Sequence, residues 1–442
     1  MRVFTTDYEK KEFWKETDIP VKKMEDCMHV VNVYPELKGQ VIQGFGGAFT
    51  EASTYNYSLL GEENRKQVMG GYFGEEGLRY NMARTHIHSC DFALGNYTYL
   101  KDGDESLDSF SIEHDRDNMI PMIKEAMETA SSKLQFLASP WSPPAFMKTN
   151  GEMNHGGKLK KEYYGMWADY IVRYIKAYAE EGIKISYLTV QNEPMAVQTW
   201  DSCIYLPEEE AEFARDYLAP ALREAGLYDV EIFIWDHNKE EVYDRVKATF
   251  ESQKTRDEVA GIAVHWYTGD HFDALEAVKK RFPEKKLFFT EGCVEYSRFA
   301  DSGEIAKAEM YAHDMLGNLK AGVEAIFDWN LLLDEKGGPN HVGNFCAAPM
   351  MCNPGEDTVE KRLTYYYIGH FSRYIKRGAR KIDTTRYTDK IETVGFENPD
   401  GERVVVLLNK SEEAVEVTLR ENGLGGQLVL QPHTIATVCY GA

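Results

Sequence analysis

Eight short runs rich in β-branched and aromatic residues alternate with longer helical patterns between residues 40 and 375 of this 442-residue chain. The runs are Val41–Phe45, Tyr80–His88, Leu134–Ala138, Ile185–Gln191, Glu231–Trp235, Gly261–Trp266, Leu287–Thr290 and Glu324–Trp329. The helical patterns lie near Glu62–Met69, Asp115–Ala130, Glu162–Glu181, Pro207–Ala225, Lys239–Glu251, Phe272–Phe282, Glu304–Lys320 and Leu363–Ile375. Parallel strands need helical crossovers between them, so eight strand–helix units predict an α/β fold, a (β/α)8 TIM barrel.

The third helical pattern illustrates the periodicity behind this prediction. Its large apolar residues recur at spacings of three and four, at Trp167, Tyr170, Ile171, Tyr174, Ile175 and Tyr178. Such spacing places them on one face of a helix, and Gly182 then provides a stop signal. We interpret this aromatic stripe as core packing rather than a cofactor site.

After Ile375 the pattern changes to short alternating runs separated by turn sequences. These runs are Thr393–Phe396, Arg403–Asn409, Ala414–Leu419, Gln427–Leu430 and Thr434–Tyr440. They predict a small antiparallel β-sandwich, to which Val30–Tyr34 supplies a further strand. The predicted domains are therefore a barrel over 39–375 and a sandwich built from 1–38 and 376–442.

Charge and cysteine content narrow the classes of partner and compartment. The chain has 50 Lys and Arg against 72 Asp and Glu, a formal net charge of −22, which repels nucleic-acid backbones. It has no apolar run long enough to span a bilayer, so no integral membrane association is expected. The seven cysteines form no C-x-x-C pair, and the first residues do not resemble a secretory signal, so we expect reduced thiols and a cytoplasmic location.

Two glutamates follow buried-type runs at the ends of predicted strands. Glu193 comes after the fourth run and before Pro194, and Glu291 comes directly after the seventh run. In a (β/α)8 barrel, the carboxyl ends of the strands build the active site. A pair of carboxylates at this face is what hydrolysis of a glycosidic bond requires, because one protonates the leaving oxygen and the other attacks the anomeric carbon.

Other predicted strand ends carry residues suited to binding a sugar. They include Arg84 and Asp91 at the second strand, Trp141 at the third, His265 and Tyr267 at the sixth, and Trp329 at the eighth. Aromatic rings stack on the C–H faces of sugars, while charged and amide groups bond their hydroxyls. The sequence therefore predicts a carbohydrate substrate.

Two further patterns have a weaker claim to function. Gly44-Phe-Gly-Gly-Ala lacks the spacing and the Lys-Ser/Thr pair of a phosphate-binding loop. His86 and His88 alternate on one strand with no third ligand at diagnostic spacing, which favours packed, hydrogen-bonded histidines. We expect no metal and no cofactor.

Taken together, these motifs resemble glycoside hydrolase family 30, which includes glucosylceramidases and β-1,6-glucanases. The resemblance extends over nearly the whole chain from Gln43-Gly-Phe-Gly-Gly-Ala-Phe-Thr onward. It continues through Ser89-Cys-Asp-Phe, Ala138-Ser-Pro-Trp-Ser-Pro-Pro, Lys148-Thr-Asn-Gly, Asn192-Glu-Pro, Thr290-Glu-Gly-Cys and Asp328-Trp-Asn-Leu.

The resemblance implies a role for each matched residue. Glu193 would be the general acid/base and Glu291 the nucleophile of a retaining mechanism. Asp91, Trp141, Asn192 and Trp329 would hold the sugar in the −1 subsite. Arg84, His265, Tyr267 and Asn344 would surround the nucleophile. We also expect the negative charge of Glu291 to raise the pKa of Glu193.

The substrate is less closely defined by these motifs. The stretch after Pro194 and the loop Cys346–Cys352 depart from the lysosomal enzymes, and both should border the side of the site that holds the leaving group. A retaining β-glucosidase of the glucosylceramidase type is the first hypothesis. The alternatives are an endo-β-1,6-glucanase, or an exo-enzyme acting on β-xylosides, β-fucosides or 6-deoxyglucosides. A non-catalytic carbohydrate-binding protein is less favoured because both glutamates are present.

Overall fold

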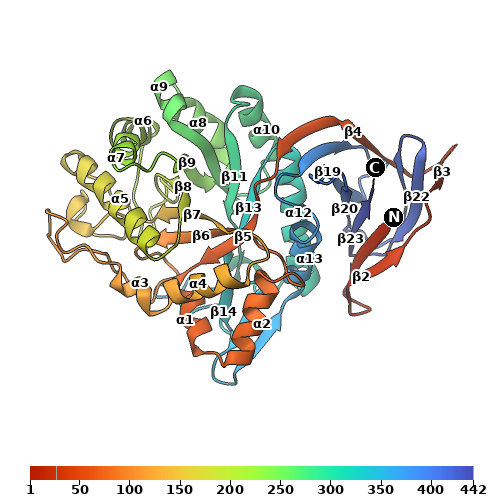
Figure 1. Ribbon diagram of the computed structural model, residues 1–442, viewed down its shortest axis with the longest axis horizontal. Coiled ribbons are helices and arrows are strands. Elements are labelled where there is room, and N and C mark those ends of the chain that lie inside the picture. The colour runs from red at the N-terminus through yellow and green to blue at the C-terminus, as the bar shows by residue number, and fades with distance from the viewer. Residues whose placement is uncertain (26, 442) are drawn as a thin grey trace.

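The barrel closes from eight parallel strands in the computed structural model, which describes residues 1–25 and 27–441 (Figure 1). Its strands are β5 (Gly44–Phe49), β6 (Met82–Ile87), β7 (Gln135–Pro140), β8 (Ile185–Thr189), β9 (Glu231–Asn238), β10 (Val259–His265), β11 (Lys286–Glu291) and β13 (Ala325–Asn330). Alternate side chains point inward and fill the interior, with Met82, Leu137, Tyr187, Phe233, Ala263, Phe288, Ala325 and Phe327 in one cluster. The predicted TIM barrel is confirmed.

The first barrel strand was predicted wrongly. Val41 ends β4 (Val30–Val41), and the barrel begins three residues later at Gly44. The glycine-rich run itself forms the strand β5, which pairs with β6. The two backbones come so close that a Cβ at Gly46 would lie 2.0 Å from the Met82 carbonyl oxygen on β6. Close approach of two backbones therefore explains the glycines, and strand propensity does not reveal such a run.

Helices cover the outside of the barrel. They are α1 (Glu51–Leu59), α2 (Glu62–Tyr72), α3 (Glu113–Asp117), α4 (Met119–Thr129), α5 (Tyr164–Glu180), α6 (Pro207–Glu212), α7 (Ala219–Glu224), α8 (Val242–Thr249), α9 (Gln253–Glu258), α10 (Phe272–Arg281), α11 (Tyr296–Phe299), α12 (Glu304–Ala321) and α13 (Leu363–Ser372). The predicted helix Pro207–Ala225 contains a π-helical turn over Phe213–Leu218 between α6 and α7. Helix α1 was not predicted, because its residues are largely polar and show little amphipathic periodicity. Among the described residues, every helix is too short or too polar to cross a bilayer.

Helix α5 buries the aromatic stripe expected of it. Trp167, Tyr170, Tyr174 and Tyr178 are all fully buried in the main core. The helix ends at Glu180, and Gly182 then adopts a positive φ of 86°. The stripe is core packing, as its spacing predicts.

Strands from both ends of the described chain form one continuous ten-stranded sheet beside the barrel. These strands are β1 (Arg2–Asp7), β2 (Glu12–Asp18), β3 (Lys22–Lys23), β4, β18 (Arg380–Thr384), β19 (Ile391–Glu397), β20 (Arg403–Asn409), β21 (Val415–Glu421), β22 (Leu424–Leu430) and β23 (Thr434–Tyr440). β4 pairs with β18 along most of its length and with β21 at its start, so it joins the layer of the sandwich that holds β18 to the layer that holds β21. Side chains from both layers meet in a separate apolar core that includes Val33, Val405 and Val417.

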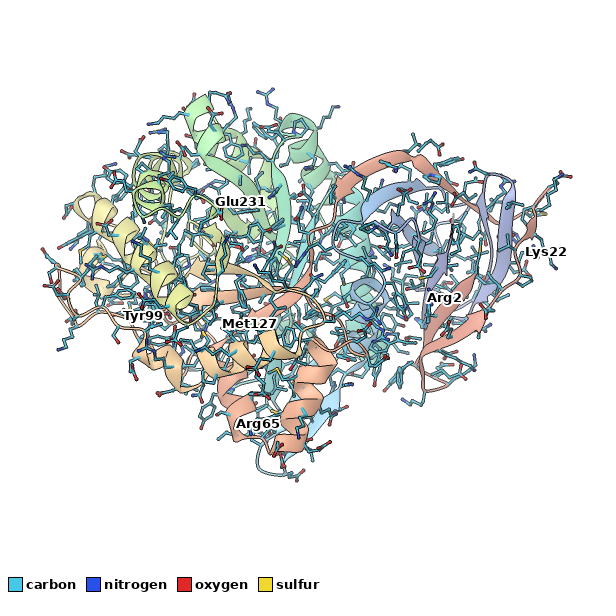
Figure 2. All side chains as sticks on the ribbon, viewed as in Figure 1. Arg2, Lys22, Arg65, Tyr99, Met127 and Glu231 are labelled. Carbon is cyan, nitrogen blue, oxygen red and sulfur yellow. The ribbon has the colours of Figure 1, made fainter. Side chains whose placement is uncertain are left out.

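Five shorter strands lie in the loops of the barrel, namely β12 (Val294–Glu295), β14 (Leu332–Asp334), β15 (Cys346–Ala347), β16 (Met350–Asn353) and β17 (Thr358–Lys361). β12 pairs with β15, which ties the loop after β11 to the loop that carries Asn344. Figure 2 shows side chains filling the space between the ribbons of both units, with Lys22 at the outer edge of the sandwich.

The helices α12 and α13 lie between the barrel and the sandwich (Figure 1). On α13, the two ring nitrogens of His370 bond the hydroxyls of Thr437 at 2.9 Å and Thr6 at 2.8 Å. Burial lowers the pKa of His370 to about 3, so this ring is a neutral polar link between the two units.

Candidate active site

The polar residues predicted at strand ends converge on one cavity at the carboxyl end of the barrel. This cavity has a volume of about 160 Å³. Its lining includes Asp91, Trp141, Asn192, Glu193, Tyr267, Glu291, Trp329 and Asn344 from the predicted set, and also Gln198, Trp200, His237, Asn238, Cys293 and Glu295. Eight of the ten predicted residues thus line a single cavity, and Arg84 and His265 lie beneath it as hydrogen-bond partners of Glu291 and Glu193.

Glu291 is the last residue of β11, and protein donors hold both of its carboxylate oxygens. Arg84 Nη1 donates to Oε2 at 2.6 Å, and the Tyr267 hydroxyl donates to Oε1 at 2.8 Å. Arg84 is fully buried on β6, so its charge is not screened by water. These contacts fix the orientation of the Glu291 side chain.

Glu193 stands in the loop after β8 with a positive φ of 47°, a conformation uncommon for a non-glycine residue. Its backbone N–H donates to the carbonyl oxygen of Asp236 at 2.9 Å, which holds this conformation in place. The Nδ1 atoms of His265 and His237 lie 3.1 and 3.6 Å from Glu193 Oε1. Strained backbone of this kind is concentrated at functional sites.

A buried carboxylate, Asp236 on β9, organises the residues below the cavity. Its oxygens accept hydrogen bonds from Arg84, Ser139, Thr189, His265 and Thr290. Burial alone would raise the pKa of Asp236. The charge of Arg84 and the hydrogen bond from His265 outweigh this effect, and the pKa of Asp236 lies below its usual range. Asp236 was not predicted, although it follows the fifth predicted strand by one position and the strand-end rule would have found it.

His265 links Asp236 to Glu193. Its Nε2 lies 3.0 Å from an Asp236 oxygen, and its Nδ1 bonds Glu193. Although burial lowers the pKa of His265, the charge of Glu291 and the hydrogen bonds with Asp236 and Glu193 raise it to about 9. Burial alone would likewise raise the pKa of Glu193. His237 and His265 outweigh this effect, and the pKa of Glu193 lies below its usual range. The expectation that the pKa of Glu193 is raised in the free protein was therefore wrong, because the facing imidazoles were not anticipated.

Asp91 lies in the loop after β6 and lines the cavity. Its Oδ2 accepts a hydrogen bond from Asn344 Nδ2 at 3.0 Å, while its buried Oδ1 has no partner among the described residues. Burial and the nearby charge of Glu291 raise the pKa of Asp91 well above its usual range. A buried polar atom without a protein partner, on a residue that lines a cavity, is a candidate to bond a ligand hydroxyl.

Trp141 and Trp329 form an aromatic floor rather than two separate platforms. Their ring centroids lie 5.3 Å apart with the planes 16° from parallel, and each tryptophan is only 2% exposed. The guanidinium of Arg84 lies over both rings, 4.8 Å from Trp141 and 5.4 Å from Trp329.

Two predicted residues lie near the nucleophile candidate without contacting it. His265 bonds Glu193 and Asp236, and Asn344 bonds Asp91. Asn192 accepts a hydrogen bond from Arg84 Nη2 at 2.9 Å, which places it beside the same guanidinium. His86 and His88, at the end of β6, are hydrogen-bonded to the protein, as expected from the sequence: His86 accepts from the Glu51 backbone N–H, and His88 bonds the Tyr170 hydroxyl.

Glu193, His265 and Glu291 have the spacing of metal ligands, with one donor atom of each within 4.8 Å of the others. The hydrogen bonds described above already engage both nitrogens of His265, and Arg84 supplies a positive charge beside Glu291. This donor set is thus arranged for proton transfer and charge stabilisation rather than for a cation.

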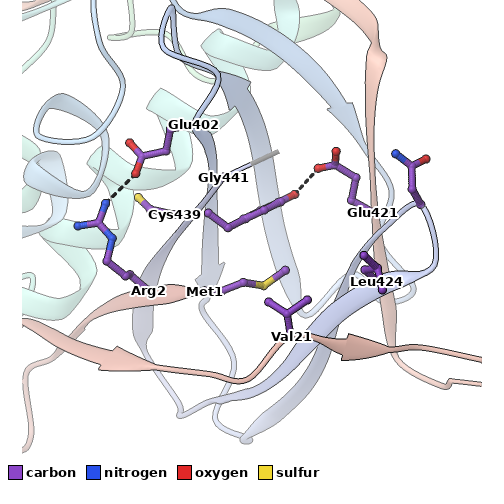
Figure 3. Close-up of a pocket in the computed structure, with 10 residues that line it drawn as sticks. Met1, Arg2, Val21, Glu402, Glu421, Leu424, Cys439 and Gly441 are labelled. Atoms are coloured by element: carbon purple, nitrogen blue, oxygen red, sulfur yellow. Dashed lines mark hydrogen bonds and ion pairs between the residues drawn. The ribbon is translucent and has the colours of Figure 1, made fainter.

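A larger cavity of about 440 Å³ is lined by residues of the sandwich, among them Arg2, Glu402, Glu421 and Tyr440 (Figure 3). Its two carboxylates are engaged by the protein, since Arg2 bonds Glu402 at 2.6 Å and the Tyr440 hydroxyl bonds Glu421 at 2.8 Å. These pairs leave it without the convergent free polar groups of the barrel cavity.

Comparison with known proteins agrees with this geometry. The glycosyl hydrolase family 30 TIM-barrel domain matches residues 42–375, and the family 30 beta sandwich domain matches residues 378–438. The lysosomal acid glucosylceramidase of Mus musculus is 34% identical over 414 residues, which cover 90% of this chain and 80% of that protein. An endo-1,6-beta-D-glucanase of Neurospora crassa is 28% identical over 405 residues, 87% of this chain and 82% of that protein.

Among solved structures, SrfJ from Salmonella typhimurium superposes with a TM-score of 0.97 at 40% identity, covering 100% of this chain and 99% of that one. Both domain models, matched in order, span nearly the entire chain. The chain therefore belongs to glycoside hydrolase family 30 and is an O-glycosyl hydrolase.

Proposed function

We propose that this protein hydrolyses β-glucosides by double displacement, with Glu291 as the nucleophile and Glu193 as the general acid/base. The observation that carries the proposal is their spacing, because an oxygen of Glu193 and an oxygen of Glu291 lie within 4.8 Å of each other. Retaining enzymes hold their two carboxyl groups ~5–5.5 Å apart, whereas inverting enzymes leave ~6.5–9.5 Å for a water molecule. The separation here supports retention.

In the first step, an oxygen of Glu291 attacks the anomeric carbon as the bond to the leaving oxygen breaks. Arg84 and Tyr267 hold the attacking carboxylate in place, so little reorganisation is needed. The product of this step is a glycosyl ester on Glu291, and the leaving oxygen takes a proton from Glu193.

The proton for the leaving group resides on the pair formed by Glu193 and His265. Nε2 of His265 bonds Asp236, and its Nδ1 lies 3.1 Å from Glu193 Oε1. One proton occupies the second contact. It is carried either by the ring, as an imidazolium, or by Glu193, as a carboxyl group. When the glycosidic oxygen approaches Glu193, the proton moves from the ring to the carboxyl group and then to the substrate.

In the second step, Glu193 acts as a base. Formation of the ester removes the charge of Glu291, so the cluster of carboxylates loses one negative charge. Glu193 accepts a proton from water as the water oxygen attacks the anomeric carbon. The bond from that carbon to Glu291 breaks, which regenerates the Glu291 carboxylate and releases the sugar with its original configuration.

Asp91 supports glucose as the sugar in the −1 subsite. Asp91 lines the cavity, and its buried Oδ1 has no partner among the described residues, so this carboxyl group is available to bond sugar hydroxyls. If the 4- and 6-hydroxyls are its partners, glucosides react faster than xylosides and 6-deoxyglucosides.

An endo-acting β-1,6-glucanase is the second candidate. It is favoured by the polar character of the cavity wall around Gln198, Trp200, His237 and Glu295, which differs from the apolar surface that a ceramide group needs. The N. crassa relative bears this activity in its name.

The proposal is tested with aryl β-glycosides and proton NMR of the first anomer released. We expect β-glucose to form first from the wild-type enzyme, and Glu291→Gln to lower kcat by at least ~10³-fold while the protein stays folded. α-Glucose as the first product, or near-normal turnover by Glu291→Gln, would contradict the assigned roles. Glu193→Ala provides a second check, because added azide should restore activity and yield the β-glycosyl azide.

A further inference from the structure

Three loops at the carboxyl end of the barrel meet around one buried carboxyl group, that of Asp201. This residue lies in the loop after β8, directly after Trp200, which lines the catalytic cavity. Its Oδ1 accepts a hydrogen bond of 2.7 Å from the hydroxyl of Ser89, in the loop after β6. Its Oδ2 lies 3.9 Å from Nε2 of His341, in the loop between β14 and β15. The mechanism proposed above uses neither Asp201 nor His341.

The two atoms of this contact, Oδ2 of Asp201 and Nε2 of His341, are both buried, and neither has a hydrogen-bond partner among the described residues. The side chain of Asp201 is 0% exposed and that of His341 is 13% exposed. Asn96 lies near the same carboxyl group and donates to Asn154 Oδ1 at 2.8 Å. Buried polar atoms are nearly always paired, so two unpaired atoms side by side require a physical explanation.

The hydrogen bond on the other side of the His341 ring explains the gap. Nδ1 of His341 lies 2.8 Å from the carbonyl oxygen of Ala93. Because a carbonyl oxygen only accepts hydrogen bonds, Nδ1 carries a proton, and Nε2 of a neutral ring is then an acceptor. Ionised Asp201 also only accepts, so no hydrogen bond forms between them. One added proton, on Nε2 or on Oδ2, turns the same contact into a strong hydrogen bond.

Titratable groups on other loops surround this contact. Cys90 and Asp91 lie in the loop after β6 and Lys148 in the loop after β7, and each interacts electrostatically with Asp201. Burial raises the pKa of Asp201, although the hydrogen bond from Ser89 lowers it. Burial therefore favours uptake of the added proton, and the positive charge of Lys148 opposes it.

The loop that carries His341 is wound into a compact turn over residues 340–344. Asn340 Oδ1 accepts hydrogen bonds from the backbone N–H groups of Val342 at 2.8 Å and Asn344 at 3.2 Å. The side-chain nitrogen of Asn340 donates to the Asn344 carbonyl oxygen at 3.2 Å. These internal bonds make His341 and Asn344 move together.

This turn is tied to the loop after β6 at two points. His341 donates to the carbonyl oxygen of Ala93, and Asn344 donates to Asp91 at 3.0 Å. A hydrogen bond between His341 and Asp201 adds a third tie, to the loop after β8. The protonation of one buried contact thus decides how firmly the loops beside the catalytic cavity are joined.

We propose that Asp201 and His341 are positioning residues that share one proton, and that the protonated pair holds Asn344 and Asp91 in place for the sugar. The inference rests on the role proposed above for Asp91 in the −1 subsite. When the pair loses its proton as pH rises, the 340–344 turn keeps two of its three ties, and Asp91 is held less firmly. The sugar then binds more weakly, which raises KM more than it lowers kcat.

The test compares KM for p-nitrophenyl β-glucoside at about pH 5.5 and about pH 8, the range in which histidine changes its charge. For the wild type, we expect KM to be at least about fivefold higher at the higher pH. In Asp201→Asn, the amide nitrogen donates to a neutral His341 without an added proton, so KM should stay low at both pH values. His341→Asn keeps a donor for Ala93 but lacks Nε2, so its KM should be high at both.

The matched control for the kinetics is Asp229→Asn. It changes an exposed aspartate that pairs with Lys184 at the opposite end of the barrel, before β9. Its KM should depend on pH as in the wild type.

Crystal structures of the wild type at the same two pH values provide a readout that does not depend on activity. At the lower pH, Nε2 of His341 and Oδ2 of Asp201 should lie about 2.7–2.9 Å apart, and at the higher pH they should remain beyond hydrogen-bond distance.

Two results would overturn this inference and leave the proposed function intact. One is a KM that depends on pH in Asp201→Asn as it does in the wild type, and the other is a distance between the two atoms that does not change with pH. By contrast, a wild type that hydrolyses no p-nitrophenyl β-glucoside at either pH would reject the β-glucosidase proposal, and the two crystal structures would still decide whether the pair shares a proton.

Discussion

At the scale of single residues, His265 has two carboxylate neighbours and a raised pKa of about 9. A single proton is shared between His265 Nδ1 and Glu193 along one hydrogen bond, so neither group titrates independently. The enzyme loses the proton needed for the leaving group only when the pair as a whole is deprotonated. This predicts an alkaline limit of activity that neither an isolated glutamate nor an isolated histidine would give.

We therefore expect kcat/KM for a poor leaving group to fall as pH rises through about 9. In His265→Gln, Glu193 alone holds the proton, and the alkaline limb should move at least about one pH unit lower. Profiles of kcat/KM against pH for the two proteins provide the measurement. An unchanged alkaline limb in the variant would show that His265 does not store this proton.

The strand-end rule found most of the residues around the cavity because each follows a run that the barrel must bury. It would also have found Asp236 and His237 had it been applied to the fifth strand. Trp200 and Glu295 were not predicted because they lie in loops after strands β8 and β11, and no local pattern fixes where such loops return to the site. The hydrogen bond between Asn344 and Asp91 joins residues far apart in sequence and has no local signal.

At the scale of elements, periodicity located the strands and helices where one face is buried and failed where other constraints dominate. Helix α5 was predicted from its aromatic stripe, and its end from Gly182. The strand β5 was misplaced because its glycines serve the close contact with β6 rather than strand propensity. In the sandwich, β1 was missed because it pairs with β23 from the other end of the chain, and β2 was missed because it is an edge strand with no fully buried residue.

Two glycines of the α5 region allow a matched test of this argument. Gly182 has a positive φ of 86°, whereas Gly165 lies inside α5, and a Cβ at either position meets no atom within 4 Å. Gly182→Ala should lower the free energy of unfolding by about 1 kcal/mol through backbone strain alone. Gly165→Ala should raise it by about 0.5 kcal/mol, because alanine restricts the unfolded chain and favours the helix. Urea unfolding of both variants measures the difference, and a stabilising Gly182→Ala would refute the assignment of a conformational stop.

At the scale of the whole molecule, α12 connects the barrel to the sandwich through two histidines. His313 lies between Glu392 on β19 at 2.8 Å and Asp270 at 2.9 Å, with Lys410 3.0 Å away. Hydrogen bonds with Glu392 and Asp270 raise the pKa of His313 although burial lowers it. A hydrogen bond from His433 to Glu309 on α12 similarly raises the pKa of His433.

A raised pKa in the folded state means that protonation stabilises the fold. The contribution of His313 is complete below the unfolded pKa of ~6.5 and is lost as pH rises through the higher folded value. We expect His313→Gln to lower the free energy of unfolding at pH 6 by about 0.5–1 kcal/mol, a small value because Asp270 is largely exposed. At pH 9 the variant and wild type should differ much less. Equal losses at both pH values, measured by urea unfolding, would show that protonation of His313 does not contribute.

The position of β23 in the sheet has a consequence for the order in which the molecule is assembled. β23 lies between β1 and β20, so the strand translated first in the sandwich has no inner neighbour until the strand translated last is available. The barrel strands and their helices emerge between these two events. A nascent chain on the ribosome can therefore complete the barrel while β1, paired only with β2, lacks its inner neighbour. Synthesis of β23 then closes the sheet and encloses the sandwich core.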